Sequence, residues 1–227
     1  MEMLVYYDGT LAIMTNRTAL ITGASRGIGR ACAESLSLGG ARVALAARSL
    51  DALEELAASL RAAGREAFAV QLDLSNADSS KEASARVAKE FGRIDILVNN
   101  AGLTFTYIDP DRYRRPEVQH FWQVSDEIVE NVMATNVLAA DRLARRVAPG
   151  MVAQGWGRIV NVTTRLDTRN RLGTHPYGAS KAALEMATEV WAKDAAGTGL
   201  TINIVNPGAG ANTPGMADEM RALSQIG

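Results

Sequence analysis

The sequence predicts one α/β domain in which a parallel β-sheet is covered by helices on both faces. Short apolar runs alternate along the chain with Ala-rich stretches, and Ala, a strong helix former, accounts for 38 of the 227 residues. The apolar runs are nearly continuous in hydrophobicity, as expected of strands buried on both faces of a parallel sheet. No internal repeat or linker interrupts the alternation, so we expect a single domain.

Six apolar runs are predicted to be strands. In chain order they are residues 18–22, 42–46, 67–71, 94–99, 158–162 and 200–205. Amphipathic helices fill the intervals, as in residues 49–63, where leucines recur at helical spacing and Gly64 is placed to end the helix. Residues 1–15 lack clear periodicity, so we expect an N-terminal extension ahead of a domain spanning residues 16–227, with Met14 as an alternative translation start.

Residues 103–124 depart from the alternation. This segment contains two prolines, several charges and five aromatic residues, which are Phe105, Tyr107, Tyr113, Phe121 and Trp122. Long loops inside compact domains are usually functional. We therefore predict that this segment covers a substrate.

Charge and composition exclude several kinds of partner. Lys and Arg number 24 against 25 Asp and Glu, so a net charge of −1 provides no basic field for nucleic acid or an anionic membrane. No apolar run approaches the roughly 20 residues that span a bilayer, and residues 1–13 lack the basic start of a secretory signal. The one cysteine, Cys32, cannot form an internal disulfide. We expect a cytoplasmic protein whose partner is a small molecule, with no nucleic acid and no membrane.

A glycine-rich turn follows the first predicted strand. It reads Thr22-Gly23-Ala24-Ser25-Arg26-Gly27-Ile28-Gly29 and opens a predicted helix. Glycines permit a tight turn and let backbone N–H groups approach a pyrophosphate at the positive end of a helix. Such a turn is also compatible with a plain strand-to-helix connection. Its place in a strand–helix–strand unit of about 30 residues favours dinucleotide binding.

The end of the second predicted strand indicates which dinucleotide binds. An acidic side chain there would bind the ribose 2′-hydroxyl of NAD, but this chain has Ala46-Ala47-Arg48. Arg48 and Arg26 can flank a 2′-phosphate with planar charged donors, which predicts NADP(H) in preference to NAD(H). Two solvated arginines are the alternative interpretation.

Further motifs follow in a fixed order along residues 16–216. They are Asp73-Leu74, Asn99-Asn100-Ala101-Gly102, Asn136, Tyr177-Gly178-Ala179-Ser180-Lys181 and Pro207-Gly208. Together with the glycine turn, this set resembles the classical short-chain dehydrogenase/reductase family. The resemblance implies a Rossmann-type doubly wound sheet and an oxidoreductase that interconverts a carbonyl and a secondary alcohol, with reduction the expected direction. It says little about the substrate.

The resemblance assigns the catalytic chemistry to Tyr177 and Lys181. Their spacing of four residues puts both side chains on one helix face. An ammonium beside a phenol lowers the phenol pKa from near 10, which would bring Tyr177 into range as general acid and base. By the same resemblance, Lys181 hydrogen-bonds the nicotinamide ribose.

Two further polar residues complete the predicted catalytic group. Thr164 stands where the family has a serine that hydrogen-bonds the substrate oxygen, and Thr163 is the neighbouring alternative. Asn136 falls on the apolar face of a predicted helix, where a buried amide must find partners. Either it ties neighbouring backbone together or, as the resemblance implies, it holds a water that links Lys181 to solvent.

The resemblance implies a larger set of cofactor contacts. They are Gly23, Ser25, Arg26, Gly27, Ile28 and Gly29 of the turn, Arg48, Asp73 and Leu74 near the adenine, Asn99, Ala101 and Gly102 along the adenosine, Tyr177 and Lys181, and Pro207, Gly208 and Thr213 near the nicotinamide and pyrophosphate. Asn99 is alternatively structural. One extra residue precedes Thr213 relative to the commonest family spacing. His120 and His175 have no ligand cluster around them, so we predict no metal.

A second loop bears on the substrate. Residues 165–176 contain Arg165, Arg169 and Arg171 against Asp167, and this excess of positive charge favours an anionic or polyhydroxylated carbonyl compound. Solvated arginines are the alternative.

Family members continue beyond the Pro-Gly motif into further helices and a seventh strand, whereas this chain ends at Gly227. We therefore expect the family's last strand to be lacking and residues 200–205 to lie at the sheet edge. Two alternatives to an active reductase are a non-catalytic dinucleotide-binding or interaction protein and a fragment of a longer enzyme. The helices that contain Asn136 and Tyr177 correspond to a family interface, which predicts a homodimer or homotetramer.

Overall fold

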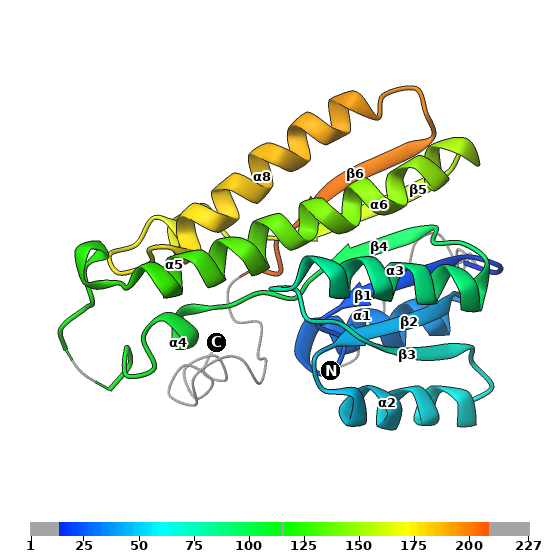
Figure 1. Ribbon diagram of the computed structural model, residues 1–227, viewed down its shortest axis with the longest axis horizontal. Helices are drawn as coiled ribbons and strands as arrows, with labels where there is room; N and C mark the ends of the chain where they lie inside the picture. Colours follow the sequence, from blue (N-terminus) through cyan, green and yellow to red (C-terminus); the bar gives the residue numbers. More distant parts are fainter. Residues whose placement is uncertain (1–13, 115, 209–227) are drawn as a thin grey trace.

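A computed structural model describes residues 14–114 and 116–208 of the chain. Within these residues, one sheet contains six parallel strands in the order β3-β2-β1-β4-β5-β6 (Figure 1). The strands are β1 (Thr18–Thr22), β2 (Arg42–Ala47), β3 (Ala67–Gln71), β4 (Ile96–Asn99), β5 (Gly157–Val162) and β6 (Leu200–Val205). All six predicted strands are confirmed. Successive strands are added on one side of β1 up to β3 and on its other side from β4 onward. Such a switch in strand order places a crevice outside the carboxyl ends of the strands.

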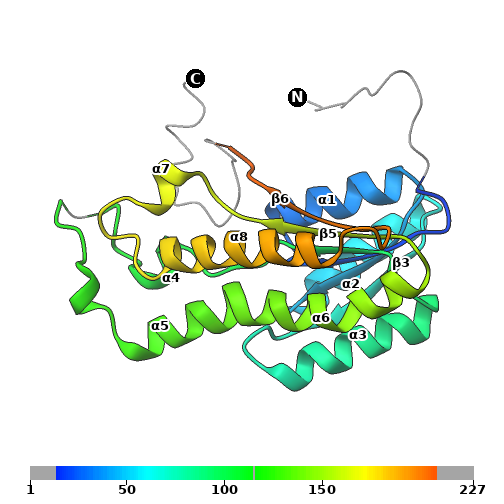
Figure 2. The ribbon, with the colours of Figure 1, turned by 90° about the horizontal axis from the view of Figure 1, so that it is seen from above.

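Helices cover both faces of the sheet, as predicted. In the described residues they are α1 (Gly27–Leu38), α2 (Leu50–Ala62), α3 (Ala77–Phe91), α4 (Phe105–Ile108), α5 (Asp126–Met133), α6 (Ala139–Ala153), α7 (Leu166–Arg169) and α8 (Tyr177–Asp194), with a 3₁₀ turn η1 (Phe121–Gln123) and a π-helical turn η2 (Ala134–Leu138). Figure 2 shows α1 on one side of the sheet and α3, α6 and α8 on the other. Helix α2 packs with α1 on the first face.

The core consists of one apolar cluster for each face of the sheet. Successive strand side chains point to opposite faces. Leu20 therefore joins the cluster under α3 and α6, whereas its neighbour Ile21 joins the cluster under α1 and α2. Both side chains are fully buried. This arrangement explains why the strand sequences are apolar at consecutive positions.

The fourth strand begins at Ile96, two residues later than predicted. The preceding Asp95 is fully buried, and its carboxylate accepts a hydrogen bond from the Thr18 backbone N–H at 2.8 Å. Arg17 and Arg93 pair with the same carboxylate at 3.2 and 3.0 Å. The Asp95 backbone still bonds both neighbours, since its N–H donates to the Thr18 carbonyl at 2.9 Å and its carbonyl accepts from the Arg158 N–H at 3.0 Å.

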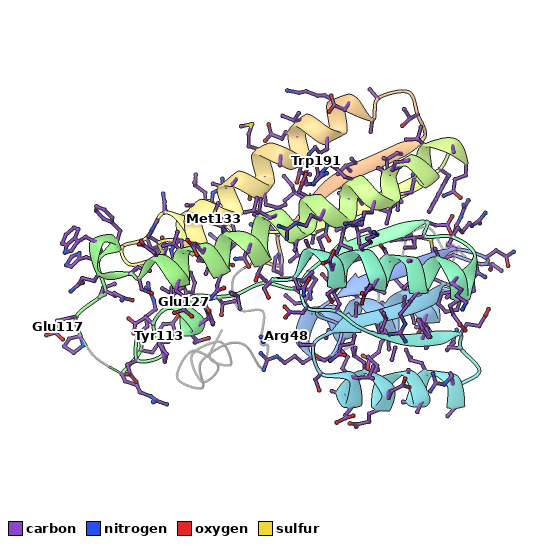
Figure 3. All side chains as sticks on the ribbon, viewed as in Figure 1. Arg48, Tyr113, Glu117, Glu127, Met133 and Trp191 are labelled. Atoms are coloured by element: carbon purple, nitrogen blue, oxygen red, sulfur yellow. The ribbon has the colours of Figure 1, made fainter. Side chains whose placement is uncertain are left out.

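Turn and loop positions follow the glycines and the inserted segment. Gly64 has a φ of +76°, in the left-handed region that favours glycine, and it follows the end of α2 as predicted. Residues 103–114 and 116–124, together with α5, project beyond the carboxyl ends of the strands (Figure 1). Figure 3 shows Tyr113 and Glu117 on this projecting part, well away from Arg48 at the end of the sheet.

Candidate active site

The glycine turn connects β1 to α1, and its first and last glycines pack tightly against each other. Gly23 and Gly27 have φ values of +68° and +57°, which favour glycine. A Cβ atom on Gly29 would lie 2.3 Å from the Gly23 carbonyl oxygen, so this position has no space for a side chain. The Gly23 N–H donates to the Ala46 carbonyl at 2.7 Å and fixes the turn to the end of β2.

The amino end of α1 fits the pyrophosphate of a dinucleotide. Arg26 is the N-cap residue, yet its side chain makes no capping hydrogen bond, and the first helical turn contains no acidic residue. Ser25 and Ile28 are half-buried beside it. The end of the helix therefore presents backbone N–H groups and a positive dipole without a competing carboxylate.

Arg26 and Arg48 carry positive charge at the ends of adjacent strands. Both side chains are exposed, and no carboxylate in the described part of the chain lies within ion-pair distance of either one. Figure 3 shows Arg48 extending outward from the β2 end of the sheet. The two guanidinium groups therefore remain available to an anionic ligand.

Hydrogen bonds that join β1 to β4 involve residues that had no predicted role. The Thr22 hydroxyl accepts from the backbone N–H groups of Asn100 and Ala101 at 3.0 and 3.1 Å, and it donates to the Val98 carbonyl at 3.2 Å. The Asn100 side-chain amide donates to the Thr22 carbonyl at 3.0 Å. Asn100 belongs to the Asn99-Asn100-Ala101-Gly102 motif, in which the sequence predicts roles only for its neighbours. These bonds hold residues 101–102 beside the glycine turn.

The side chain of Asn99 makes its contacts in the protein interior. Its amide donates to Asn161 Oδ1 at 2.8 Å, and the Asn161 amide donates to the Thr188 hydroxyl at 2.8 Å. All three residues are buried. The network ties β4, β5 and α8 together, which favours the structural alternative for Asn99 over a cofactor contact.

Asp73 and Leu74 follow β3 and differ in exposure. Asp73 is exposed, and its Oδ1 atom accepts from the Ser75 N–H at 3.0 Å and the Ser75 hydroxyl at 2.7 Å. Leu74 is buried in the core cluster under α3. Asp73 therefore offers polar atoms at the carboxyl edge of the sheet, whereas Leu74 mainly contributes packing.

Tyr177 and Lys181 occupy the first two turns of α8. Their side chains are buried, with residue exposures of 8% and 5%. Lys181 Nζ lies 5.9 Å from the Tyr177 ring centroid and donates to the Val162 carbonyl at 2.8 Å. The pair predicted from the sequence spacing is therefore brought together beneath the carboxyl end of β5.

The pKa of Tyr177 differs from the sequence expectation. Burial raises the pKa of the Tyr177 phenol, and a side-chain hydrogen bond with Thr164 acts in the opposite direction. Burial also lowers the pKa of Lys181 to about 8. The sequence predicts that the Lys181 ammonium lowers the phenol pKa, but the net shift is upward because desolvation of the phenol dominates. Tyr177 therefore holds its proton at neutral pH.

Thr164 and Thr163 have different surroundings. Thr164 is half-buried, and its side chain lies near enough to the Tyr177 phenol to oppose the rise of the phenol pKa. Thr163 is buried, its backbone N–H donates to the Val205 carbonyl at 2.9 Å, and its hydroxyl has no hydrogen-bond partner among the described residues. The geometry therefore favours Thr164 of the two alternatives.

Asn136 lies in the π-helical turn η2 and is buried. Its amide donates to the Leu103 carbonyl and the Ser180 hydroxyl, both at 3.0 Å, while its oxygen accepts from the Leu103 N–H at 2.8 Å. Ser180, which had no predicted role, donates to the Tyr177 carbonyl at 2.7 Å. These contacts match the interpretation in which Asn136 ties backbone segments together.

Gly102 brings the backbone close to both Asn136 and Lys181. A Cβ atom on Gly102 would lie 3.1 Å from Asn136 Oδ1 and 3.6 Å from Lys181 Nζ. A side chain here would enter the space beside the predicted catalytic residues. Ala101 packs partly against the neighbouring core.

A polar cavity adjoins the end of β5. Its volume is about 510 Å³, and it is lined by Arg165, Leu166, Asp167, Asn170 and Asn206. Arg165 pairs with Asp167 at 2.9 Å, and Arg169 pairs with Glu185. These carboxylates offset two of the three arginine charges, so the loop gives little support to an anionic substrate.

The Pro207-Gly208 motif follows β6 at the same edge. Both residues are exposed, Gly208 has a φ of +78°, and its N–H donates to Asn206 Oδ1 at 2.9 Å. Thr213 lies outside the described residues, as do residues 1–13 of the predicted extension. Met14 packs against the core cluster under α1 and α2.

A larger cavity, of about 740 Å³, lies between α3 and α6. Lys81 and Arg142 line it, but none of the predicted site residues does.

In the described ranges, no group of three or more His, Cys, Asp or Glu residues is arranged to hold a metal. No helix in the same ranges is long and apolar enough to cross a membrane. The predicted chemistry gathers instead at the carboxyl edge of the sheet.

The glycine turn lies beside the switch in strand order, and the buried Tyr–Lys pair lies at the same edge. This combination is typical of an α/β oxidoreductase with a dinucleotide-binding fold. A family profile described as short chain dehydrogenase matches residues 17–223. The chain belongs to this family, and the resemblance seen in the sequence is confirmed.

Relatives within the family have different activities. A 3-oxoacyl-[acyl-carrier-protein] reductase of Staphylococcus epidermidis is 34% identical over 85% of this chain and 75% of its own length. The gluconate 5-dehydrogenase of Gluconobacter oxydans is 34% identical over 86% and 72%. The structure of L-sorbose reductase from Gluconobacter frateurii, complexed with NADPH and L-sorbose, has a TM-score of 0.78 and 32% identity over 88% of this chain and 72% of that one.

Proposed function

We propose that the protein is an NADP(H)-dependent oxidoreductase that interconverts a carbonyl and a secondary alcohol and works mainly as a reductase. One observation carries this proposal: the Tyr177 phenol and the Lys181 ammonium are buried together one helical turn apart, with Nζ 5.9 Å from the Tyr177 ring centroid, and Thr164 lies near enough to the phenol to oppose the rise of its pKa. Burial keeps Tyr177 protonated at neutral pH, which suits a proton donor in carbonyl reduction.

Each catalytic residue has a distinct part in the proposed reaction. The Thr164 hydroxyl holds the carbonyl oxygen, and Tyr177 Oη donates its proton to that oxygen as the alkoxide charge develops. The nicotinamide, when bound, supplies the hydride. Lys181 then stabilises the phenolate electrostatically, because a pKa of about 8 leaves its ammonium mainly protonated at neutral pH.

Asn136 acts on the shape of the site. Its three hydrogen bonds fix Leu103 and the first turn of α8, so residues 102–103 stay beside Lys181. We assign it a positioning role in which the side chain orders backbone around the reacting groups.

We propose NADP(H) as the preferred cofactor. The glycine turn and the uncapped end of α1 fit its pyrophosphate. Arg26 and Arg48, which pair with no carboxylate among the described residues, supply guanidinium groups for the 2′-phosphate. The L-sorbose reductase of the same family is complexed with NADPH, which supports this choice.

The proposed substrate is a small-molecule ketone or the corresponding alcohol. Related enzymes are named for a 3-oxoacyl group, gluconate and sorbose, so we propose the reacting group and leave the rest of the substrate open. The polar cavity lined by Arg165 and Asp167 also contains two asparagines, Asn170 and Asn206, that can hydrogen-bond neutral hydroxyl or carbonyl groups.

We also propose a homodimer or homotetramer in the cytoplasm. Leu138, Met186 and Val190 expose large apolar side chains on η2 and α8, the helices expected to form the interface. Size-exclusion chromatography with light scattering distinguishes these assemblies from a monomer.

Two measurements test the proposed function. Nicotinamide fluorescence measures the binding of NADPH and NADH, and NADPH absorbance then follows the reduction of 3-oxoacyl thioesters, keto sugars, keto acids and simple ketones. We expect binding of NADPH and reduction of at least one compound. Binding without any reduction would favour the non-catalytic alternative, and absence of binding would reject both functions.

A further inference from the structure

Phe105 covers the ring of Tyr177. The two ring centroids are 4.6 Å apart, with an interplanar angle of 60°. Such edge-on aromatic contacts stabilise a defined relative orientation of the rings. Phe105 belongs to an apolar cluster with Ile108 and Val132, separate from the two clusters that cover the sheet. The projecting segment therefore supplies one wall around the phenol.

Arg112 joins the two segments beside this wall. Its guanidinium carbon lies 4.9 Å from the Phe105 ring centroid. Its Nη2 atom donates to the Leu172 carbonyl at 3.1 Å, and Nη1 donates to the Gly173 carbonyl. One planar group thus contacts the Phe105 ring and two carbonyls that lie about sixty residues further along the chain.

The residues on either side of the two Arg112 acceptors are held in place by hydrogen bonds. The Thr174 hydroxyl reaches the carbonyls of Arg169 and Arg171 at 2.9 and 2.7 Å. Arg169 pairs with Glu185 of α8, the helix that begins with Tyr177. The carbonyls that receive Arg112 are therefore connected to the same helix that carries the phenol.

We propose that Arg112 is a positioning residue that holds Phe105 against Tyr177, so that the phenol keeps one orientation and stays shielded from water during proton transfer. We call this unit the Arg112 latch; it comprises Phe105, Arg112 and the carbonyls of Leu172 and Gly173. The proposal rests on the proposed function of Tyr177. It assigns to the projecting segment a part in the chemistry of the catalytic tyrosine.

The shape of the side chain matters as well as its charge. A guanidinium can stack on an aromatic ring while two of its N–H groups donate in one plane, whereas a lysine ammonium is a point charge on a flexible stem. Lysine at this position therefore keeps the charge and loses the simultaneous contacts. This difference separates the latch from a general electrostatic effect.

The variants Arg112→Ala, Arg112→Lys and Phe105→Leu test the latch. Arg114→Ala is the matched control, because Arg114 is 71% exposed in the same segment and pairs only with Asp111, at 3.5 Å, within the described residues. We expect Arg112→Ala and Arg112→Lys to lower kcat by about 10-fold or more through misplacement of the reacting groups, with NADPH binding unchanged. Arg114→Ala should behave like the wild type.

The pH profile separates the latch from simple loss of folding. Among the described residues, the charged and polar groups recorded near the Tyr177 ring or its Phe105 cover are Lys181 on α8, Arg112 and Thr164, which follows β5. Because burial raises the pKa of Tyr177, hydration after loss of the latch should lower it and move the alkaline loss of reductase activity to lower pH. Thermal unfolding of each variant confirms that the fold persists.

A second readout does not require turnover. Tyrosinate absorbance, titrated in the wild type and in Tyr177→Phe, isolates the ionisation of Tyr177, and Arg112→Lys should shift this ionisation to lower pH. Wild-type activity in Arg112→Lys, an unshifted titration in a folded variant, or equal effects of Arg112→Ala and Arg114→Ala would overturn the latch. If the wild type reduces no carbonyl compound, the proposed function fails, while the titration still decides whether Arg112 shields the phenol.

Discussion

Asn136 binds both backbone polar groups of Leu103, accepting from its N–H at 2.8 Å and donating to its carbonyl at 3.0 Å. A single side chain thus replaces the strand partner that residue 103 lacks after β4 ends. The same amide also reaches Ser180 on α8. This contact links the end of β4 to the helix that carries Tyr177 and Lys181.

Asn136→Ala should destabilise the protein and lower its activity. Loss of the amide leaves the half-buried backbone polar groups of Leu103 without this partner, which costs about 1–3 kcal/mol of unfolding free energy. Urea denaturation measures this loss. Asn203→Ala is the control, because Asn203 is exposed on β6 and should tolerate the change. Equal stability of the two variants would contradict the positioning role of Asn136.

Tyr177→Phe should abolish reduction while preserving the fold. Phenylalanine keeps the ring that packs on Phe105 and loses only the hydroxyl that supplies the proton. Loss of a general acid typically lowers the rate by about 10²–10⁴-fold. Single-turnover NADPH oxidation measures the rate, and nicotinamide fluorescence should show unchanged cofactor binding. Turnover near the wild-type rate would exclude Tyr177 as proton donor.

Lys181→Met should change how stability depends on pH. The pKa of Lys181 is about 8 in the folded protein against an ordinary 10.5, so the unfolded chain binds more protons between these values. The stability contribution of Lys181 therefore rises with pH through that interval. Relative to Lys181→Met, the wild type should gain about 2–3 kcal/mol between pH 7 and pH 10. A constant difference across this range, measured by urea denaturation, would show that Lys181 is not desolvated.

Arg48→Ala should weaken NADPH binding and spare NADH binding. A charge-assisted hydrogen bond to the 2′-phosphate contributes about 1.5–3 kcal/mol, which corresponds to roughly 10- to 150-fold in Kd. Fluorescence titration with both cofactors measures the change. Arg146→Ala, an exposed residue of α6, provides the control. Equal weakening of NADPH and NADH would reject the 2′-phosphate contact.

Local sequence patterns determined the architecture of this protein. The continuous apolar runs predicted all six strands because a strand buried on both faces needs apolar side chains at every position. The sequence also predicted the glycine turn, since Gly29 has no room for a Cβ atom and Gly23 has a positive φ. The spacing of Tyr177 and Lys181 placed them together because helical periodicity is a local property.

Only the tertiary structure decided how neighbouring polar residues divide their roles. Asn99 and Asn100 are adjacent in the sequence, yet one joins the interior network and the other holds the glycine turn. The π-helical turn at Asn136 and the burial that raises the Tyr177 pKa likewise arise from packing between distant segments. The hydrogen bond from Arg112 to Leu172 in the proposed latch joins residues sixty positions apart. Periodicity shows which face a residue occupies, whereas its partners and its hydration depend on elements that meet only when the whole chain folds.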